Sequence, residues 1–106
     1  MPIVKQADSL FIDYEVPLYG AIDSTWGNWG GTYEISVSDT SIPIISGSLT
    51  RSAREGIFEL RLKSDNATWT AISAGTYKLI TQFSNSTVGY REERTDKLIV
   101  KTQGLT

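Results

Sequence analysis

The 106-residue chain contains no cysteine and no histidine. Without cysteine, neither a disulfide framework nor a thiolate metal site can form, and the best side-chain nucleophile is missing. Without histidine, the commonest general base and the commonest metal ligand are missing, and no serine can complete a triad with an imidazole. Serines are plentiful, but no G-x-S-x-G elbow occurs. We therefore expect no enzyme activity, no cofactor and no bound metal ion.

Long hydrophobic runs and a strong excess of either charge are absent as well. No apolar run approaches the roughly 20 residues that span a bilayer, and the opening MPIVKQADSL has no apolar core of signal-peptide length. The net charge is −2, and Lys and Arg form no run longer than the mixed REER of residues 91–94. Because phosphate binding usually needs a basic face, we expect no nucleic acid partner. We also expect neither a membrane anchor nor secretion through a signal.

The composition that is present is typical of a folded domain. Apolar residues make up 40% of the chain and charged residues 21%, which is too apolar for a disordered chain and too polar for a membrane protein. A chain of this length supports one hydrophobic core with little left for a second. We expect one domain over residues 1–106, with short polar tails at residues 1–7 and 102–106.

Alternation of apolar and polar residues with a period of two dominates the chain. Three stretches place apolar residues at every second position, as strands with one buried face do. The inward positions are Leu10, Ile12, Tyr14 and Val16, then Tyr33, Ile35 and Val37, then Phe58, Leu60 and Leu62. Residues 41–50, SIPIISGSLT, predict a further strand that bulges or begins irregularly near its proline.

The clearest element is a hairpin within residues 73–101. Its first strand directs apolar and small residues inward, the polar NSTVG turns the chain, and the second strand returns. The inward residues are Tyr77, Leu79, Thr81 and Phe83, then Leu98 and Val100. Before the hairpin, SDNATWTAISAG is typical of a turn and a single helical turn near residues 66–72. About seven short strands without an amphipathic helix predict an all-β sandwich.

The stretch TWGNWGGTY, residues 25–33, has the most unusual composition. Its glycines allow close approach of the backbone, and Trp26 and Trp29 offer flat apolar faces with an N–H donor. The glycines lead into a strand and not a helix, so they do not form a phosphate-binding motif. Three interpretations stay open: sugar stacking on the tryptophans, docking against a protein, and packing within the sandwich.

The stretch GYREERTD, residues 89–96, alternates charges on the second strand of the hairpin. Arg91 and Glu93 alternate with Glu92 and Arg94. Cross-strand ion pairs on a solvated face would explain the pattern, each contributing about 0–1 kcal/mol. At an interface, the same opposite charges would set register and partner choice.

Three weaker motifs have mainly structural interpretations. Asp13 and Glu15 lie about 7 Å apart on one face of a strand, a spacing that could serve acid–base chemistry on a glycoside but usually marks a solvent face. SDNAT and SVSDTS contain oxygen ligands without the spacing of a calcium loop, which leaves only an incidental calcium ion. Without a secretion signal, the sequons at Asn66 and Asn85 indicate loop residues.

The second half of the chain resembles the immunoglobulin-like modules of tailed-phage virion proteins. The resemblance lies in the stretch GSLTRSAREGIFELRLKSDNATW and in the stretch AISAGTYKLITQFSNSTVGYREERTDKLIVK that follows it. Such modules occur at the N-terminus of upper baseplate proteins and in related tail and head-decoration proteins. The matching features are the step Ala74-Gly75-Thr76-Tyr77 before a strand, and Leu98 and Val100 in the closing strand. QADSLFIDYEVPL is similar to the usual first strand, so the resemblance covers roughly residues 6 to 102. It implies an immunoglobulin-like β-sandwich of about seven strands.

The resemblance also implies a structural role without catalytic residues. We expect a non-enzymatic protein of the virion, assembled in the host cytoplasm, that decorates or cements the capsid through contacts with the major capsid protein. A tail or baseplate component is the first alternative, and a carbohydrate-binding module that stacks a glycan on Trp26, Trp29 or Trp69 is the second. We expect a homo-oligomer or many copies on one assembly. The expected contact residues are Tyr19, Trp26, Trp29, Arg91, Glu93 and Arg94.

Overall fold

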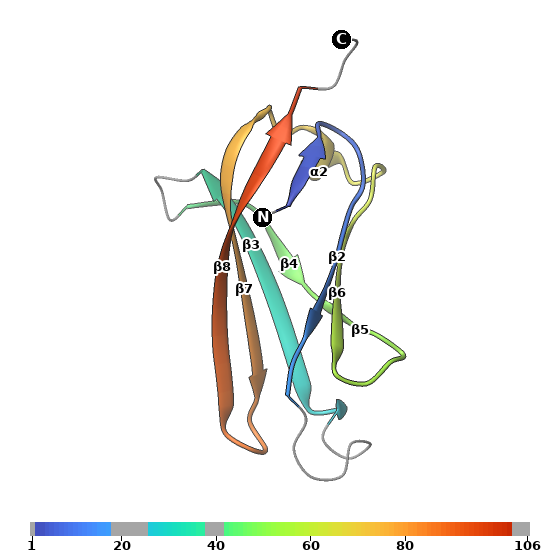
Figure 1. Cartoon of the computed structure of the whole chain (residues 1–106), viewed down its shortest axis with the longest axis vertical. Coiled ribbons are helices and arrows are strands. Elements are labelled where there is room, and N and C mark those ends of the chain that lie inside the picture. Colours follow the sequence, from blue (N-terminus) through green and yellow to red (C-terminus); the bar gives the residue numbers. More distant parts are fainter. Residues whose placement is uncertain (1, 18–25, 38–41, 103–106) are drawn as a thin grey trace.

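Two β-sheets pack face to face in the computed structural model, which describes residues 2–17, 26–37 and 42–102 (Figure 1). The larger sheet contains, in spatial order, β1 (Ile3–Lys5), β8 (Tyr90–Lys101), β7 (Gly75–Asn85), β3 (Trp29–Val37) and β4 (Pro43–Ser48). The smaller sheet contains β2 (Leu10–Glu15), β6 (Ile57–Leu62) and β5 (Thr50–Arg51). The predicted all-β sandwich is confirmed, and the predicted hairpin β7–β8 lies inside the larger sheet.

The connectivity is that of an immunoglobulin-like sandwich. The first segment of the chain serves both sheets, because β1 runs parallel to β8 while β2 pairs antiparallel with β6. Near the start of β7, the hydroxyl of Tyr77 donates a hydrogen bond of 2.6 Å to the carbonyl of Ser73. A tyrosine that binds back to the preceding backbone at this corner is a hallmark of such sandwiches.

The predicted inward residues form the core, with one exception. Phe58, Phe83, Ile35 and Leu98 are fully buried, and the other inward positions are buried or half-buried. Val37 is the exception, at 45% exposed, whereas its neighbour Ser36 is buried. The register between β3 and β4 shifts between Ile35 and Ser36 and skips Ile44. This bulge confirms the irregular strand predicted for residues 41–50, and Val37 lies past the end of the β3–β4 ladder.

The short helix α2 (Ala67–Thr70) confirms the predicted helical turn. The side chain of Asn66 caps it by accepting a hydrogen bond from the backbone N–H of Trp69. The indole of Trp69 is buried and donates 2.7 Å to the carbonyl of Asp8. Asn85, the other sequon residue, is buried at the end of β7 and accepts from the N–H of Thr87. Both asparagines therefore have structural roles, and Asn85 belongs to a strand and not to a loop.

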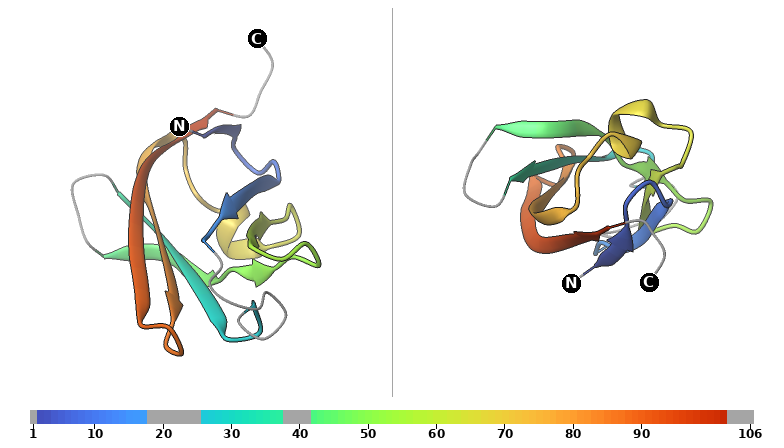
Figure 2. Two further views of the ribbon diagram at one scale, coloured as in Figure 1. Left: turned by 60° about the horizontal axis from the view of Figure 1, so that its bottom comes forward. Right: turned by 90° about the horizontal axis from the view of Figure 1, so that it is seen from above.

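The prediction of a polar N-terminal tail is wrong, because residues 3–5 form β1. Figure 2 shows β1 beside the end of β8 in two further views. Hydrogen bonds from Ile99 N–H to the Pro2 carbonyl (3.0 Å) and from Gln6 N–H to the Lys101 carbonyl (2.7 Å) extend the ladder at both ends. Most of the predicted C-terminal tail lies outside the described residues.

Two adjacent glycines in β3 face opposite sides of the larger sheet. A Cβ atom on Gly31 would lie 3.1 Å and 3.2 Å from side-chain atoms of Leu49 and Phe58, inside the core. A Cβ atom on Gly30 would have nothing within 4 Å. Gly31 therefore allows the two sheets to approach each other, while Gly30 leaves open space on the outside.

We predict that Gly31→Ala destabilises the protein and that Gly30→Ala does not. The added methyl at position 31 forces Leu49 or Phe58 to move, and overpacking of this kind costs about 1–3 kcal/mol. At position 30 alanine removes the entropic penalty of a strand glycine without a clash. Urea unfolding of both variants measures the difference. Equal free energies of unfolding for the two variants would contradict the assignment of Gly31 to the core.

Candidate interaction surface

The structure places the tryptophans in the core and not on the surface. Trp26 is 9% exposed, Trp29 3% and Trp69 1%. The Trp26 ring packs on Phe58 with centroids 5.1 Å apart, and the Trp29 ring packs on Tyr90 at the same distance. The indole N–H of Trp29 finds no acceptor among the described residues. The expectation of exposed tryptophan faces is wrong, and these three indoles offer no platform for stacking a sugar.

The remaining contact candidates are on different sides of the sheet. Tyr19 lies outside the described residues. Arg91 and Glu93 are exposed on the outer face, by which we mean the face of the larger sheet turned away from the smaller sheet. Arg94 has the opposite parity along β8 and points toward the smaller sheet, where it is only partly exposed. The structure therefore separates Arg94 from Arg91 and Glu93.

Arg94 connects the two sheets at their open edge. Its guanidinium stacks over the Phe83 ring, 4.6 Å from the centroid, and donates 2.7 Å to the carbonyl of Glu15 at the end of β2. It also forms an ion pair with Glu92, with Nη2 and Oε1 2.9 Å apart. Tyr90 donates its hydroxyl proton to the same carboxylate. The expected cross-strand ion pairs are thus wrong for these two residues, which pair within one strand.

The pKa shifts of Glu92, Arg94 and Tyr14, which we call the inner cluster, all favour the protonation state that each group ordinarily has near neutral pH. Hydrogen bonds from Arg94 and then from Tyr90 lower the pKa of Glu92 from 4.5 to about 2. The hydrogen bond with Glu92 raises the pKa of Arg94. Burial, with help from Asp96, raises the pKa of Tyr14 to about 12. These shifts keep Glu92 and Arg94 charged and Tyr14 protonated near neutral pH, and we interpret the cluster as a structural clamp.

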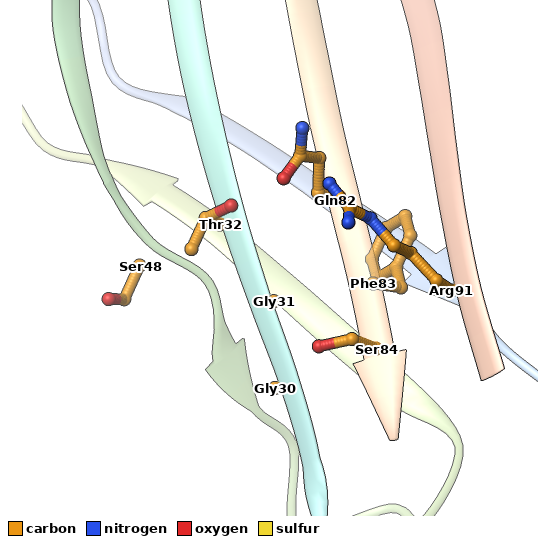
Figure 3. A pocket seen from close by; sticks show the side chains of 8 residues that line it. All are labelled: Gly30, Gly31, Thr32, Ser48, Gln82, Phe83, Ser84 and Arg91. Carbon is orange, nitrogen blue, oxygen red and sulfur yellow. The ribbon is translucent and has the colours of Figure 1, made fainter. Parts of the chain in front are cut away.

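On the outer face, the absence of a side chain at Gly30 leaves a hollow of about 430 Å³. It is lined by Gly30, Gly31, Thr32, Ser48, Gln82, Phe83, Ser84 and Arg91. In Figure 3 the guanidinium of Arg91 extends from β8 over β7 toward the amide of Gln82. Gln82 in turn donates 2.9 Å to Glu93 across the strands. We call this feature the outer hollow.

The outer hollow offers hydrogen bonds without burying a charge. Thr32, Ser48 and Ser84 supply hydroxyls that both donate and accept, and the guanidinium of Arg91 supplies a fork of donors. Arg91 forms no ion pair within residues 2–17, 26–37 and 42–102. Such a surface can accept a polar or acidic side chain from a partner. Of the lining residues, only Arg91 was among the contact residues expected from the sequence, because the hollow is formed by residues that the sheet register brings together.

The weaker motifs have ordinary structural roles. Asp13 forms an ion pair of 2.6 Å with Arg61, which also stacks on the exposed ring of Phe11. The carboxylate proposed for acid–base chemistry is therefore one partner of a surface ion pair. Among the described residues, no three acidic side chains gather to hold a metal ion. Within residues 2–17, 26–37 and 42–102, no helix is long and apolar enough to span a membrane.

Comparison with known proteins gives no further assignment. No protein-family model matches the chain, and no curated protein is significantly similar to it.

We predict that the Glu92–Arg94 clamp makes stability depend on acidic pH. The pKa of Glu92 is lower in the folded state, so its contribution is fully present above about pH 4.5 and is lost as the pH falls toward 2. Glu92→Gln should be less stable than the wild type at pH 7, and the gap should close on acidification. Thermal unfolding at a series of pH values measures this. Glu34→Gln, on the exposed outer face of β3, is the matched control, and a constant gap for Glu92→Gln would refute the clamp.

Proposed function

We propose that this chain is a non-enzymatic assembly protein that binds its partner through the outer face of the larger sheet. The observation that carries the proposal is the outer hollow beside Arg91, an accessible cation without an ion pair among the described residues. Buried hot spots of protein interfaces are often arginines seated in such depressions. The hydroxyls around the hollow add hydrogen bonds of the kind found at interfaces.

We further propose that the assembly is a tailed-phage particle, with capsid decoration as the leading role and a tail or baseplate position as the alternative. The support is the resemblance of the second half of the chain, whose Ala74-to-Tyr77 step overlaps the start of β7 and whose Leu98 and Val100 are buried in the core on β8. A shell presents many equivalent sites. Weak contacts by one small domain would therefore be strengthened where copies also touch one another.

We predict that filling the outer hollow weakens partner binding strongly without unfolding the protein. Gly30→Tyr places a ring where the structure leaves space, and tyrosine favours a strand. The experiment is co-sedimentation with heads and with tails purified from the phage that encodes the chain. We expect saturable binding of the wild type to heads and a loss of about tenfold or more for Gly30→Tyr, as for interface hot spots. Arg91→Gln should weaken binding in the same direction.

The matched control is Thr50→Tyr, which adds the same ring to an exposed position of the smaller sheet. It should bind like the wild type. Binding of the wild type to tails alone would favour the tail or baseplate role. Wild-type protein that binds neither heads nor tails would overturn the phage proposal, and equal binding by Gly30→Tyr would overturn the surface.

A further inference from the structure

The register of the larger sheet gathers four of the chain's five lysines on its outer face. Lys97 on β8 lies directly opposite Lys78 on β7, and Lys101 on β8 lies directly opposite Lys5 on β1. We call these four residues the lysine patch. Three of them are exposed, and Lys78 is half-buried. They come from three different strands, β1, β7 and β8, which is why the sequence shows no basic run.

The lysine patch is not neutralised by the part of the chain that the structure describes. None of its four side chains forms an ion pair there. Asp96 is adjacent to Lys97 in sequence but has the opposite parity, and its carboxylate accepts the backbone N–H of Lys97. Like charges directly opposite each other destabilise a pair of strands. Acidic groups of a partner would relieve this local repulsion at both pairs.

The two lysine pairs have a defined spacing, and a pair of isoleucines lies between them. Lys97 and Lys101 are four residues apart on one strand, so the pairs are separated by about 13 Å. Ile99 and its parallel partner Ile3 lie between them on the same face, and Ile3 is 53% exposed. A depression of about 310 Å³ borders the first pair and is lined by Thr76, Tyr77, Lys78, Thr95, Asp96 and Lys97.

We propose that the lysine patch binds an extended acidic segment of a partner protein, with acidic residues at positions i and i+4 and an apolar residue at i+2. In an extended segment these three side chains point the same way and match the spacing of the patch. Each carboxylate can accept hydrogen bonds from both ammonium groups of one lysine pair. The apolar residue covers Ile3 and Ile99. The inference rests on the proposed function, because it takes the outer face as the contact surface.

The same face argues against a nucleic acid or an anionic membrane as the partner. Each strand of a DNA duplex carries one phosphate for about every 3.4 Å of helix axis, so it would also place charge on the isoleucines between the lysine pairs. Glu34 and Glu93 are exposed on the outer face and would repel a continuous negative surface. Discrete carboxylates at a fixed spacing avoid both conflicts.

The test measures binding of a labelled synthetic peptide by fluorescence anisotropy at low salt. The probe carries glutamate at i and i+4 and isoleucine at i+2, and the control peptide has the same composition with the second glutamate moved to i+3. We expect the probe to bind more tightly than the control. The double variant Lys97→Gln, Lys101→Gln should bind the probe about fivefold to tenfold more weakly, as expected for loss of exposed ion pairs. Lys63→Gln, which changes the one lysine outside the patch, should bind like the wild type.

A second measurement requires no ligand. Lys97→Gln should raise the thermal midpoint at low salt, and the gain should shrink at high salt because salt screens the repulsion that the substitution removes. Equal binding of both peptides, or equal binding by the double variant, would overturn the inference. Tighter binding of a DNA duplex or of phosphatidylserine vesicles than of the probe would also overturn it.

Co-sedimentation with phage particles separates this inference from the proposed function. Particles that bind the double variant as well as the wild type would refute the lysine patch while leaving the proposed function standing. Particles that do not bind the wild type, together with selective binding of the probe peptide, would refute the phage role and leave the lysine patch standing.

Discussion

The register of the β7–β8 hairpin is the constraint on which the rest of the structure depends. The two strands pair without interruption from Gly75 opposite Val100 to Asn85 opposite Tyr90. A slip of one residue would exchange every inward side chain of β8 for an outward one. Two features hold the turn: the buried side chain of Asn85, which accepts from the N–H of Thr87, and the positive φ of Gly89. That register buries Leu98 in the core and places the guanidinium of Arg94 over the ring of Phe83. It also directs the lysines of β7 and β8 to the outer face.

Most of the fold could be predicted from the sequence because its main signal is local. A period of two assigns each residue of a strand to one face, and the larger side chains identify the buried face. This reasoning found the core positions of β2, β6 and β7, including the fully buried Phe58 and Phe83. It failed at Val37, where a register shift against β4 ends the regular ladder, and at residues 3–5, whose pairing with β8 depends on a strand distant in sequence.

The candidate surface was harder to predict, since it depends on contacts between distant segments. Tryptophans beside glycines are compatible with a sugar platform and with a core, and only the packing of Trp26 on Phe58 and of Trp29 on Tyr90 decides for the core. Arg91 and Glu93 were found as charged residues, but the hollow beside Arg91 requires Gly30 from another strand. The lysine patch had no sequence signal, because β1, β7 and β8 meet only in the folded sheet.

Charged side chains are paired on the inner face of β8, whereas like charges lie opposite each other on its outer face. The first arrangement contributes to stability, and the second does not. On the inner face, Glu92 and Arg94 pair with each other and Arg94 also binds the carbonyl of Glu15, because partial burial makes an unpaired charge costly. On the outer face, water tolerates single charges, so stability does not require them to pair. Placing Lys97 opposite Lys78 does not stabilise the fold, because the two like charges repel each other. We therefore propose the lysine pairs, whose arrangement folding does not explain, as the place where a partner binds.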